Sequence, residues 1–267
     1  MAETEPPFGP KSEELQKNEN SRLFKKLKEN STIEIHGQKI AIPAATLDKT
    51  FKIFTERVLV FFPQDTLSEE VANALFRIQL IIFLIDNYYE SHWDYKEDEI
   101  SPLWDEVTLL IRHLGVGENQ VKQFLQDIRA YEKVEQQMRK GDTPDSVEIK
   151  NFYFLKSCDV RLQRHLAKFV QAGEVCSSTP VQTDYDILGE ILDDIDDMEE
   201  DQARDVYNGN RLIFDLKKNR QAAIDEYKNF ISSIANKYEA NDSSGIRELA
   251  GSVLEKIQKI LLAEEAV

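Results

Sequence analysis

Cysteine is scarce in this chain, with Cys158 and Cys176 as its two examples among 267 residues. Two thiols make no disulfide framework, and their spacing gives no zinc site, so we expect both to be reduced. The basic and then apolar run of a signal peptide is also missing, because the first residues are rich in Glu and Pro. The sequence therefore predicts a cytoplasmic protein.

Long apolar runs and an excess of positive charge are missing too. The longest apolar run, Leu80 to Ile85, is far too short to span a bilayer. Lys and Arg number 33 against 49 Asp and Glu, which gives a net charge of −16. Such a surface repels nucleic-acid phosphates and anionic lipids. We therefore expect no membrane span and no nucleic-acid partner.

The remaining patterns are those of an all-α protein. Apolar and polar positions alternate over residues 31–43 and predict a small β-hairpin. From residue 45 onward apolar residues recur at three and four, the period of an α-helix. We predict one helical barrel or bundle of about eight to ten helices over 45–267. A disordered tail at 1–10 and an N-terminal helix and hairpin at 11–44 precede it.

Two of the predicted helices carry acidic residues in unusual places, and the first covers residues 71–93. Its run from Leu80 to Ile85 is apolar around the whole helix, which predicts burial on all sides. Asp86 and Glu90 follow at a spacing of four and so share one face. Carboxylates at the mouth of a buried helix must be paired, protonated or metal-bound. The alternative is that the helix reaches the surface at Asp86.

The second acidic helix is predicted from about 181 to 207, where Asn208-Gly209-Asn210 would end it. Seven of the nine residues from Asp193 to Asp201 are acidic, and no Lys or Arg lies among them. Like-charge neighbours at three and four would cost this helix about 2 kcal/mol in all. Either a solvated face tolerates this charge, or divalent cations compensate for it.

Together the two segments resemble the class I isoprenoid synthase superfamily, which includes polyprenyl, squalene, phytoene and class I terpene synthases. Asp86-Asn87-Tyr88-Tyr89-Glu90 resembles its first motif, DDxxD, with Asn in second place. Gly189 to Asp197 resembles its second motif, FQxxDDxxD, with Gly and Glu replacing Phe and Gln. Leu155 to Arg161 is similar to the segment that contributes a diphosphate-binding cation. Trp93, Asp94 and Lys96 stand where chain-elongating prenyl synthases have paired arginines.

The resemblance implies a deep apolar pocket with Mg²⁺ and a prenyl diphosphate bound at its rim. The catalytic groups it implies are Asp86, Glu90, Asp193 and Asp197, and the metal ligands are these four with Asp194. The diphosphate-binding cations it implies are Lys156, Arg161 and Arg204. Phe83, Tyr89, Trp93 and Phe154 would line the substrate pocket, although such aromatic residues more often belong to a plain core.

These residue types suit the ionisation of an allylic diphosphate. Mg²⁺ binds through one or two carboxylates with phosphate oxygens and water, and Lys or Arg holds the departing diphosphate. We therefore expect a Mg²⁺-dependent, terpene-synthase-like lyase that ionises a prenyl diphosphate to a carbocation. The alternatives are a prenyltransferase of the polyprenyl synthase type and a non-catalytic helical interaction protein. The sequence leaves open whether the chain forms a homodimer.

Overall fold

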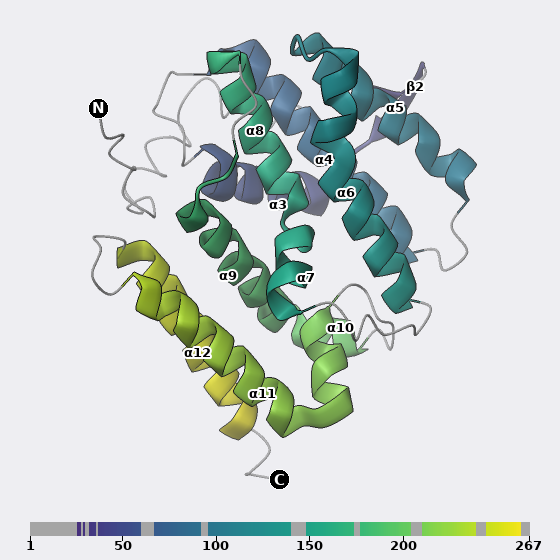
Figure 1. Ribbon diagram of the computed structural model, residues 1–267. Coiled ribbons are helices and arrows are strands. Elements are labelled where there is room, and N and C mark those ends of the chain that lie inside the picture. The colour runs from purple at the N-terminus through teal and green to yellow at the C-terminus, as the bar shows by residue number, and fades with distance from the viewer. Residues whose placement is uncertain are drawn as a thin grey trace, which may run out of the picture. The chain divides into compact units, whose positions relative to one another are not determined.

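The structure is a computed structural model of the chain. It describes residues 26–27, 29, 32–35, 37–59, 67–91, 96–139, 148–173, 177–203, 210–238 and 244–262. Over this part it has ten α-helices, α3 to α12, and one two-stranded sheet (Figure 1). The predicted all-α fold with a small N-terminal hairpin is therefore confirmed. The predicted tail at 1–10 lies outside the described residues.

The hairpin forms where the alternating pattern predicts it. Strands β1 (Thr32–Ile35) and β2 (Gln38–Ala41) pair antiparallel, with Thr32 opposite Ala41 and Ile35 opposite Gln38. Gly37 in the turn has a φ of +78°, a conformation that glycine adopts without steric cost. The alternation of side chains along β1 buries Ile33 and Ile35.

The described chain folds into two compact units, each built from separate stretches of sequence. The N-terminal unit comprises residues 9–126 and 159–177, and the C-terminal unit comprises 127–158 and 178–267. Each of the two acidic segments lies in a different unit. A single helical domain over 45–267 stays a prediction.

The N-terminal unit contains α3 (Ala44–Ile53), a π-helical turn (Phe54–Val58), α4 (Glu69–Ser91), α5 (Glu97–His113), the first part of α6 (Glu118–Arg139) and most of α8 (Cys158–Ala172). Helix α4, which carries Asp86, packs against α3 and α5. Leu80, Ile81 and Ile85 are buried, but Ile82, Phe83 and Leu84 are only half-buried. The apolar run is therefore not buried on all sides, which differs from the expectation.

Helix α4 is also the one helix in the described part that is long and apolar enough to cross a membrane. This holds for Glu69–Tyr89 by length and composition, although the uninterrupted apolar run is short. Half of this stretch is buried inside the protein. Such burial is compatible with a core helix of a soluble protein and with the predicted absence of a membrane span.

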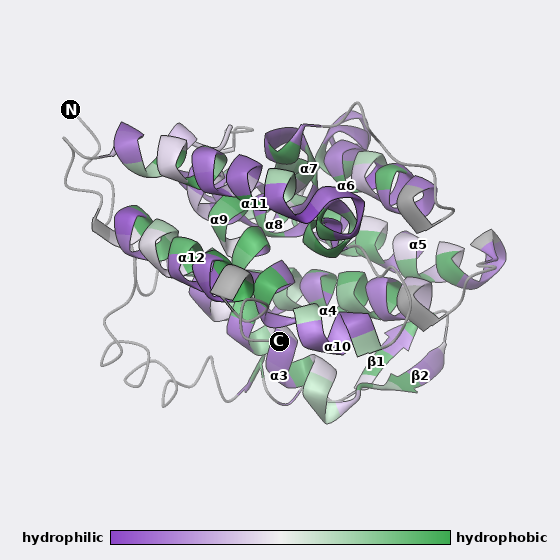
Figure 2. Ribbon diagram, turned by 90° about the horizontal axis from the view of Figure 1, so that it is seen from below, coloured by the Kyte–Doolittle hydropathy of each residue, from purple (hydrophilic) through white to green (hydrophobic). Residues whose placement is uncertain are grey.

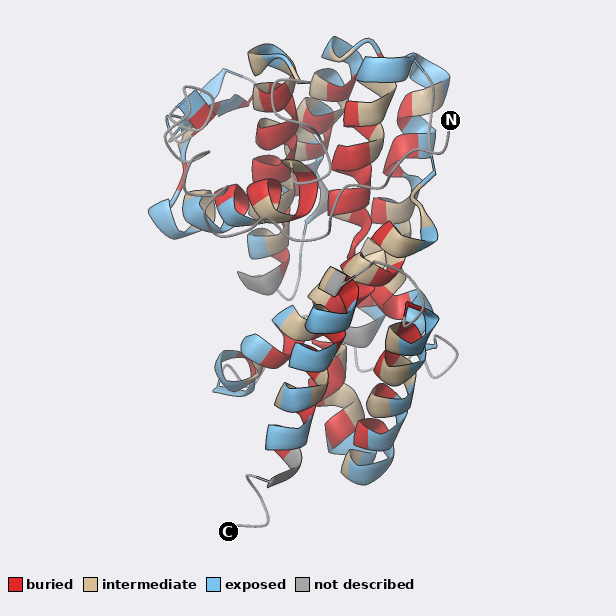
Figure 3. Cartoon of the chain, turned by 90° about the vertical axis from the view of Figure 1, so that its left-hand side faces the viewer, coloured by how far each residue is buried: buried red, intermediate tan, exposed pale blue. Residues whose placement is uncertain are grey.

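The C-terminal unit contains the rest of α6 with α7 (Ile149–Lys156), α9 (Pro180–Asp196), α10 (Met198–Ala203), α11 (Arg211–Lys237) and α12 (Ser244–Leu262). Helix α9 packs against α7, α11 and α12. The helices are amphipathic, and apolar and polar residues separate on α12 in Figure 2. On the same helix, which leads to the C-terminus in Figure 3, exposed and buried residues separate likewise. The buried sides form one core around Ile187, Ile191 and Tyr227.

The long helix predicted from about 181 to 207 is divided in the structure. It begins as expected, because Thr179 and Gln182 form a capping box and Pro180 occupies the first turn. Helix α9 ends at Asp196, however, and α10 begins at Met198 after a break at Asp197 with φ −85° and ψ −2°. Crowded like charges weaken a continuous helix here. Residues 204–207 lie outside the described part.

Helix α11 has a kink at Asn219, whose φ of −158° and ψ of 94° are not helical. The Asn219 Oδ1 accepts a hydrogen bond from the Ala222 backbone N at 3.2 Å and so caps the second segment. The kink lets Tyr227 donate to Asp215 Oδ2 at 3.2 Å. In a straight helix these two residues would lie about 18 Å apart along the axis.

Candidate functional site

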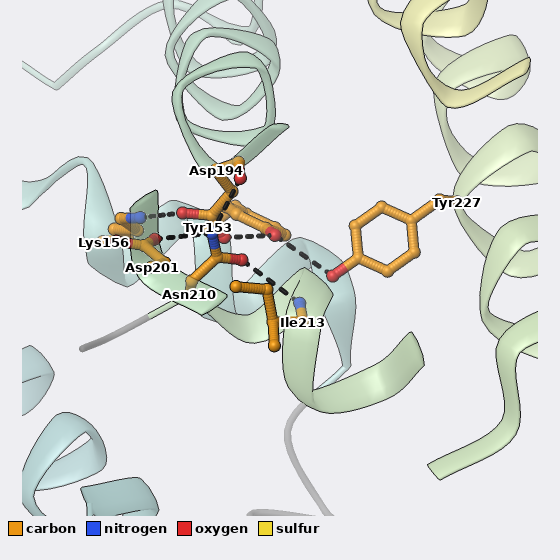
Figure 4. A network of polar contacts seen from close by, with 7 residues as sticks. All are labelled: Tyr153, Lys156, Asp194, Asp201, Asn210, Ile213 and Tyr227. Carbon is orange, nitrogen blue, oxygen red and sulfur yellow. Dashed lines mark hydrogen bonds and ion pairs between the residues drawn. The ribbon is translucent and has the colours of Figure 1, made fainter. Parts of the chain in front are cut away.

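Lys156, the last residue of α7, forms an ion pair with the acidic end of α9 on its buried side. The Lys156 ammonium pairs with Oδ1 of Asp194, whose side chain is only 2% exposed. Tyr153 lies three residues earlier on the same face of α7 and donates to Asp194 Oδ2 at 2.8 Å. Both oxygens of Asp194 are thus engaged within the C-terminal unit (Figure 4).

A chain of hydrogen bonds continues from this pair to α11. The hydroxyls of Tyr153 and Tyr227 lie 3.1 Å apart, so the single hydrogen of Tyr227 serves either Tyr153 or Asp215. Arg211 Nε donates to Asp215 Oδ2 at 3.0 Å. Burial, followed by the charges of Asp194 and Asp215 respectively, raises the pKa of Tyr153 and of Tyr227 well above 10. Both phenols therefore stay protonated and act as hydrogen-bond donors. The network joins α7, α9 and both segments of α11.

The buried pair of Lys156 and Asp194 is charged at neutral pH. Burial raises the pKa of the Asp194 carboxyl to about 6, despite the opposing charge of Lys156. Burial lowers the pKa of Lys156, but the negative charges of Asp194 and Glu190 outweigh it, so this pKa lies above its ordinary value. The proton therefore resides on Lys156, and the energetic penalty of burial falls on Asp194.

This raised pKa predicts a pH-dependent stability. The contribution of Asp194 to the free energy of unfolding is fully present below about pH 4 and is lost as the pH rises through about 6. The loss should amount to about 3 kcal/mol. Urea unfolding of the wild type and of Asp194→Asn, measured from pH 4 to pH 7, should show the difference shifting in favour of the variant as the pH rises. A difference that stays constant over this range would contradict the raised pKa.

Other acidic residues of the run also find partners on neighbouring elements. Lys256 of α12 pairs with Asp196, and the Asn210 amide donates to Asp201 Oδ2 at 2.9 Å. Lysines from α7 and α12 therefore supply part of the compensation that the run itself lacks. Asp193 and Asp197 are exposed. They lie one helical turn apart, since the Asp197 backbone N donates to the Asp193 carbonyl at 2.9 Å.

Asp193 and Asp197 fit part of what Mg²⁺ requires. Within the described ranges, no group of three or more His, Cys, Asp or Glu side chains is arranged to hold a metal ion. Mg²⁺ needs only one or two carboxylates when phosphate oxygens and water complete its octahedral shell. Asp193 and Asp197 are both exposed at the end of α9, and that they bind Mg²⁺ in this way stays a prediction. Asp194, the third predicted ligand on this helix, contacts Lys156 and Tyr153 in the structure, and its role as a metal ligand stays a prediction.

The first acidic segment lies in the N-terminal unit. Asp86 is half-buried on α4, and the side chain of Glu90 lies outside the described part. Arg161, only 2% exposed, belongs to α8 in the same unit. That Asp86 faces Asp193 and that Arg161 contacts diphosphate stay predictions. Arg204 is likewise outside the described residues.

The predicted pocket residues divide between the units as well. Phe83 and Tyr89 lie on α4, and the Lys49 ammonium sits 5.8 Å from the centre of the Phe83 ring. Phe154 lies on α7 and packs, half-buried, against the core of the C-terminal unit. Trp93 is outside the described part. A shared pocket lined by these side chains stays a prediction.

Sequence reasoning missed Tyr153, Tyr227 and Asn210. The two tyrosines are fully buried, and a buried tyrosine needs a partner for its hydroxyl. Tyr153 could have been found from its position one turn before Lys156. Asn210 was expected to end a helix, yet it caps the start of α11 by accepting from the Ile213 backbone N. The apolar periodicity that begins at Leu212 was the available signal.

A comparison of the chain with models of known families, with curated proteins and with solved structures finds no match. The resemblance to class I isoprenoid synthases therefore depends on the motifs quoted above. Membership of this superfamily stays a prediction.

Proposed function

We propose that this protein is a Mg²⁺-dependent enzyme similar to class I terpene synthases, which ionises a prenyl diphosphate to a carbocation. The observation that carries the proposal is the pair Asp193 and Asp197, exposed one turn apart at the end of α9. Asp193 and Asp197 would hold Mg²⁺ through their carboxylates. The bound metal would neutralise the negative charge that develops on the diphosphate.

The buried ion pair next to Asp193 and Asp197 favours a metal-binding site over a plain acidic surface. A solvated face needs only exposed carboxylates, whereas here Asp194 is buried and bound by Lys156 and Tyr153. Buried ion pairs seldom add net stability over an apolar core, but they can fix the position of the elements that carry them. In our proposal the Lys156–Asp194 pair positions α9, so that Asp193 and Asp197 point to solvent.

One observation favours a second candidate, a non-catalytic helical interaction protein. Lys156 and Lys256 already compensate two acids of the run without any metal. The acidic end of α9 would then be a structural surface whose charge is balanced by neighbouring helices. The two candidates differ in how the protein responds to Mg²⁺ and diphosphate.

Thermal unfolding with Mg²⁺, with inorganic diphosphate and with both together separates these candidates. We expect the joint shift in Tm to exceed the sum of the two separate shifts, because diphosphate oxygens complete the coordination of the metal. At a hundredfold excess over the dissociation constant the stabilisation should reach about 2.7 kcal/mol. Strictly additive shifts, or an equal response to any divalent salt, would favour the non-catalytic candidate.

A further inference from the structure

The corner in α11 at Asn219 lacks the sequence features that usually bend a helix. Sharp kinks occur mostly at Pro, at Gly or Ser pairs and at π-bulges. Residues 211–237 contain neither Gly nor Pro, and their Ser pair at 232–233 is remote from the corner. The residues on either side, 216–218 and 220–223, are Leu, Lys, Arg, Gln and Ala, which all favour a helix. Apart from Asn219, the local sequence therefore favours a straight helix.

The apolar face of α11 also continues through the corner in one helical register. The buried positions on this face are Leu212, Leu216, Ala223, Tyr227, Ile231 and Ile234. Successive members are three, four or seven residues apart, which is the spacing along one side of an uninterrupted α-helix. The same sequence thus suits a bent and a straight form, and contacts at the corner decide between them.

Two contacts at the corner favour the bent form. The Asn219 Oδ1 accepts from the Ala222 backbone N at 3.2 Å, as the N-cap of the second segment. The Tyr227 hydroxyl lies 3.2 Å from Asp215 Oδ2 on the other side of the corner. A straight helix would lose both contacts, because Asn219 would become an interior residue and the other pair would lie about three turns apart.

The part of the chain beyond the corner is held together by its own contacts. The second segment of α11 packs against α12. The Arg220 guanidinium donates to the Ile260 carbonyl at 2.8 Å, and the Lys228 ammonium donates to Gln258. Residues 220–262 can therefore move as one element without losing these bonds.

This element covers the apolar face of α9. Tyr238 donates to Asp184 Oδ2 at 2.9 Å near the start of α9, and Lys256 pairs with Asp196 at its end. Between these two contacts, Ile187 of α9 belongs to the same buried core as α11 and α12. The identical element of a second copy would form every one of these contacts with α9, because the residue pairs are the same.

We propose that this chain dimerises by exchanging residues 220–262 between two copies, with Asn219 as the hinge. When α11 straightens, its second segment and α12 leave their own α9 and cover the α9 of the partner copy, which does the same in return. Exchange of an identical element is a low-cost route to a dimer, since the monomer and the dimer share their contacts. The two forms then differ chiefly at the corner. This exchange does not depend on the proposed enzymatic function.

Three variants of the full chain test the hinge. Asn219→Ala removes the cap and raises the helix propensity. Arg220→Pro suits the bent form, because proline is favoured at the first position of a helix but breaks a helix in its interior. Arg220→Ala is its matched control, since it also loses the bond to Ile260 but permits both forms. Each protein is unfolded in urea and refolded, and its mass is measured by light scattering over a range of concentrations.

We expect Asn219→Ala to raise the dimerisation constant about a hundredfold, because each of the two chains gains about tenfold from the lost cap and the higher propensity. Arg220→Pro should stay monomeric at concentrations at which Arg220→Ala behaves as the wild type does. If Asn219→Ala does not fold, Asn219→Gln, which also lacks the cap and favours a helix, takes its place. An Asn219 variant as monomeric as Arg220→Pro would overturn the proposal.

A cross-linking experiment separates exchange from ordinary association. Equal amounts of unlabelled and ¹⁵N-labelled Asn219→Ala are refolded together, and a carbodiimide joins lysine amines to carboxylates in ion pairs. In the dimer fraction, about half of the Lys256–Asp196 products should contain one label of each kind, because the two residues then belong to different copies. The Lys259–Glu255 product, formed within α12, should stay of one label. Lys256–Asp196 products of one label alone would show association without exchange and contradict the proposal.

Discussion

Replacing Lys156 by methionine is expected to lower the free energy of unfolding by about 3–5 kcal/mol at pH 8. Methionine keeps most of the length of the side chain but removes the cation, so Asp194 is left as a buried charge without its partner ammonium. At pH 5 the loss should be smaller. The pKa of Asp194 is already about 6 and rises further without Lys156, so the carboxyl is neutral at that pH.

Lys256→Met is the matched control for this variant. Lys256 pairs with Asp196 of the same acidic run, but the two side chains are 35% and 50% exposed. A pair as exposed as this one should contribute less than about 1 kcal/mol. Adding Asp194→Leu to Lys156→Met should restore most of the lost stability, since no buried charge remains. Equal effects of Lys156→Met and Lys256→Met in urea unfolding would contradict the anchoring role of the buried pair.

Asp193→Asn and Asp197→Asn are each expected to lower turnover of a prenyl diphosphate at least about a hundredfold. Removal of a metal ligand forfeits several kcal/mol of transition-state stabilisation, and each 1.4 kcal/mol is a factor of ten. The Tm should stay the same or rise slightly, because either substitution relieves repulsion between neighbouring acids. Product formation by mass spectrometry and thermal unfolding measure the two quantities.

Asp196→Asn serves as the control for these two variants. Asp196 is an exposed acid of the same run, but it pairs with Lys256 and lies outside the proposed site. Its replacement should leave turnover within about twofold of the wild type, because a shift of a few tenths of a kcal/mol changes a rate no more than this. Lost turnover accompanied by a large fall in Tm would show that Asp193 and Asp197 are structural. An equal loss in Asp196→Asn would indicate a general effect of charge.

The helices and the hairpin could be predicted because their signals are local. The alternation over residues 31–43 and the helical period that begins near residue 181 act over a few neighbouring positions, and the structure forms the hairpin and the start of α9 as predicted. The break at Asp197 could not be read in this way, because the apolar stripe of α9 continues through Met198. The hydrogen bonds that connect the end of α9 with α10 come from Asn210, beyond the periodic segment.

The candidate site was predictable only in the residue types that it contains. Lys156 and Asp194 were both selected from the sequence, one for diphosphate and the other for metal. Their ion pair joins residues 38 positions apart on two packed helices, and periodicity carries no information on such a contact. The burial of Asp194, which directs its carboxylate inward while Asp193 remains exposed, follows from the packing of α9 against α7.

The most direct test of the central claim is incubation of the full chain with C10 to C20 prenyl diphosphates and Mg²⁺, followed by mass spectrometry. We expect one or more of these substrates to lose diphosphate and give a hydrocarbon or alcohol product. The reaction should stop when Mg²⁺ is chelated and in Asp193→Asn and Asp197→Asn. The absence of turnover for every substrate in a wild-type protein that is folded would contradict the account.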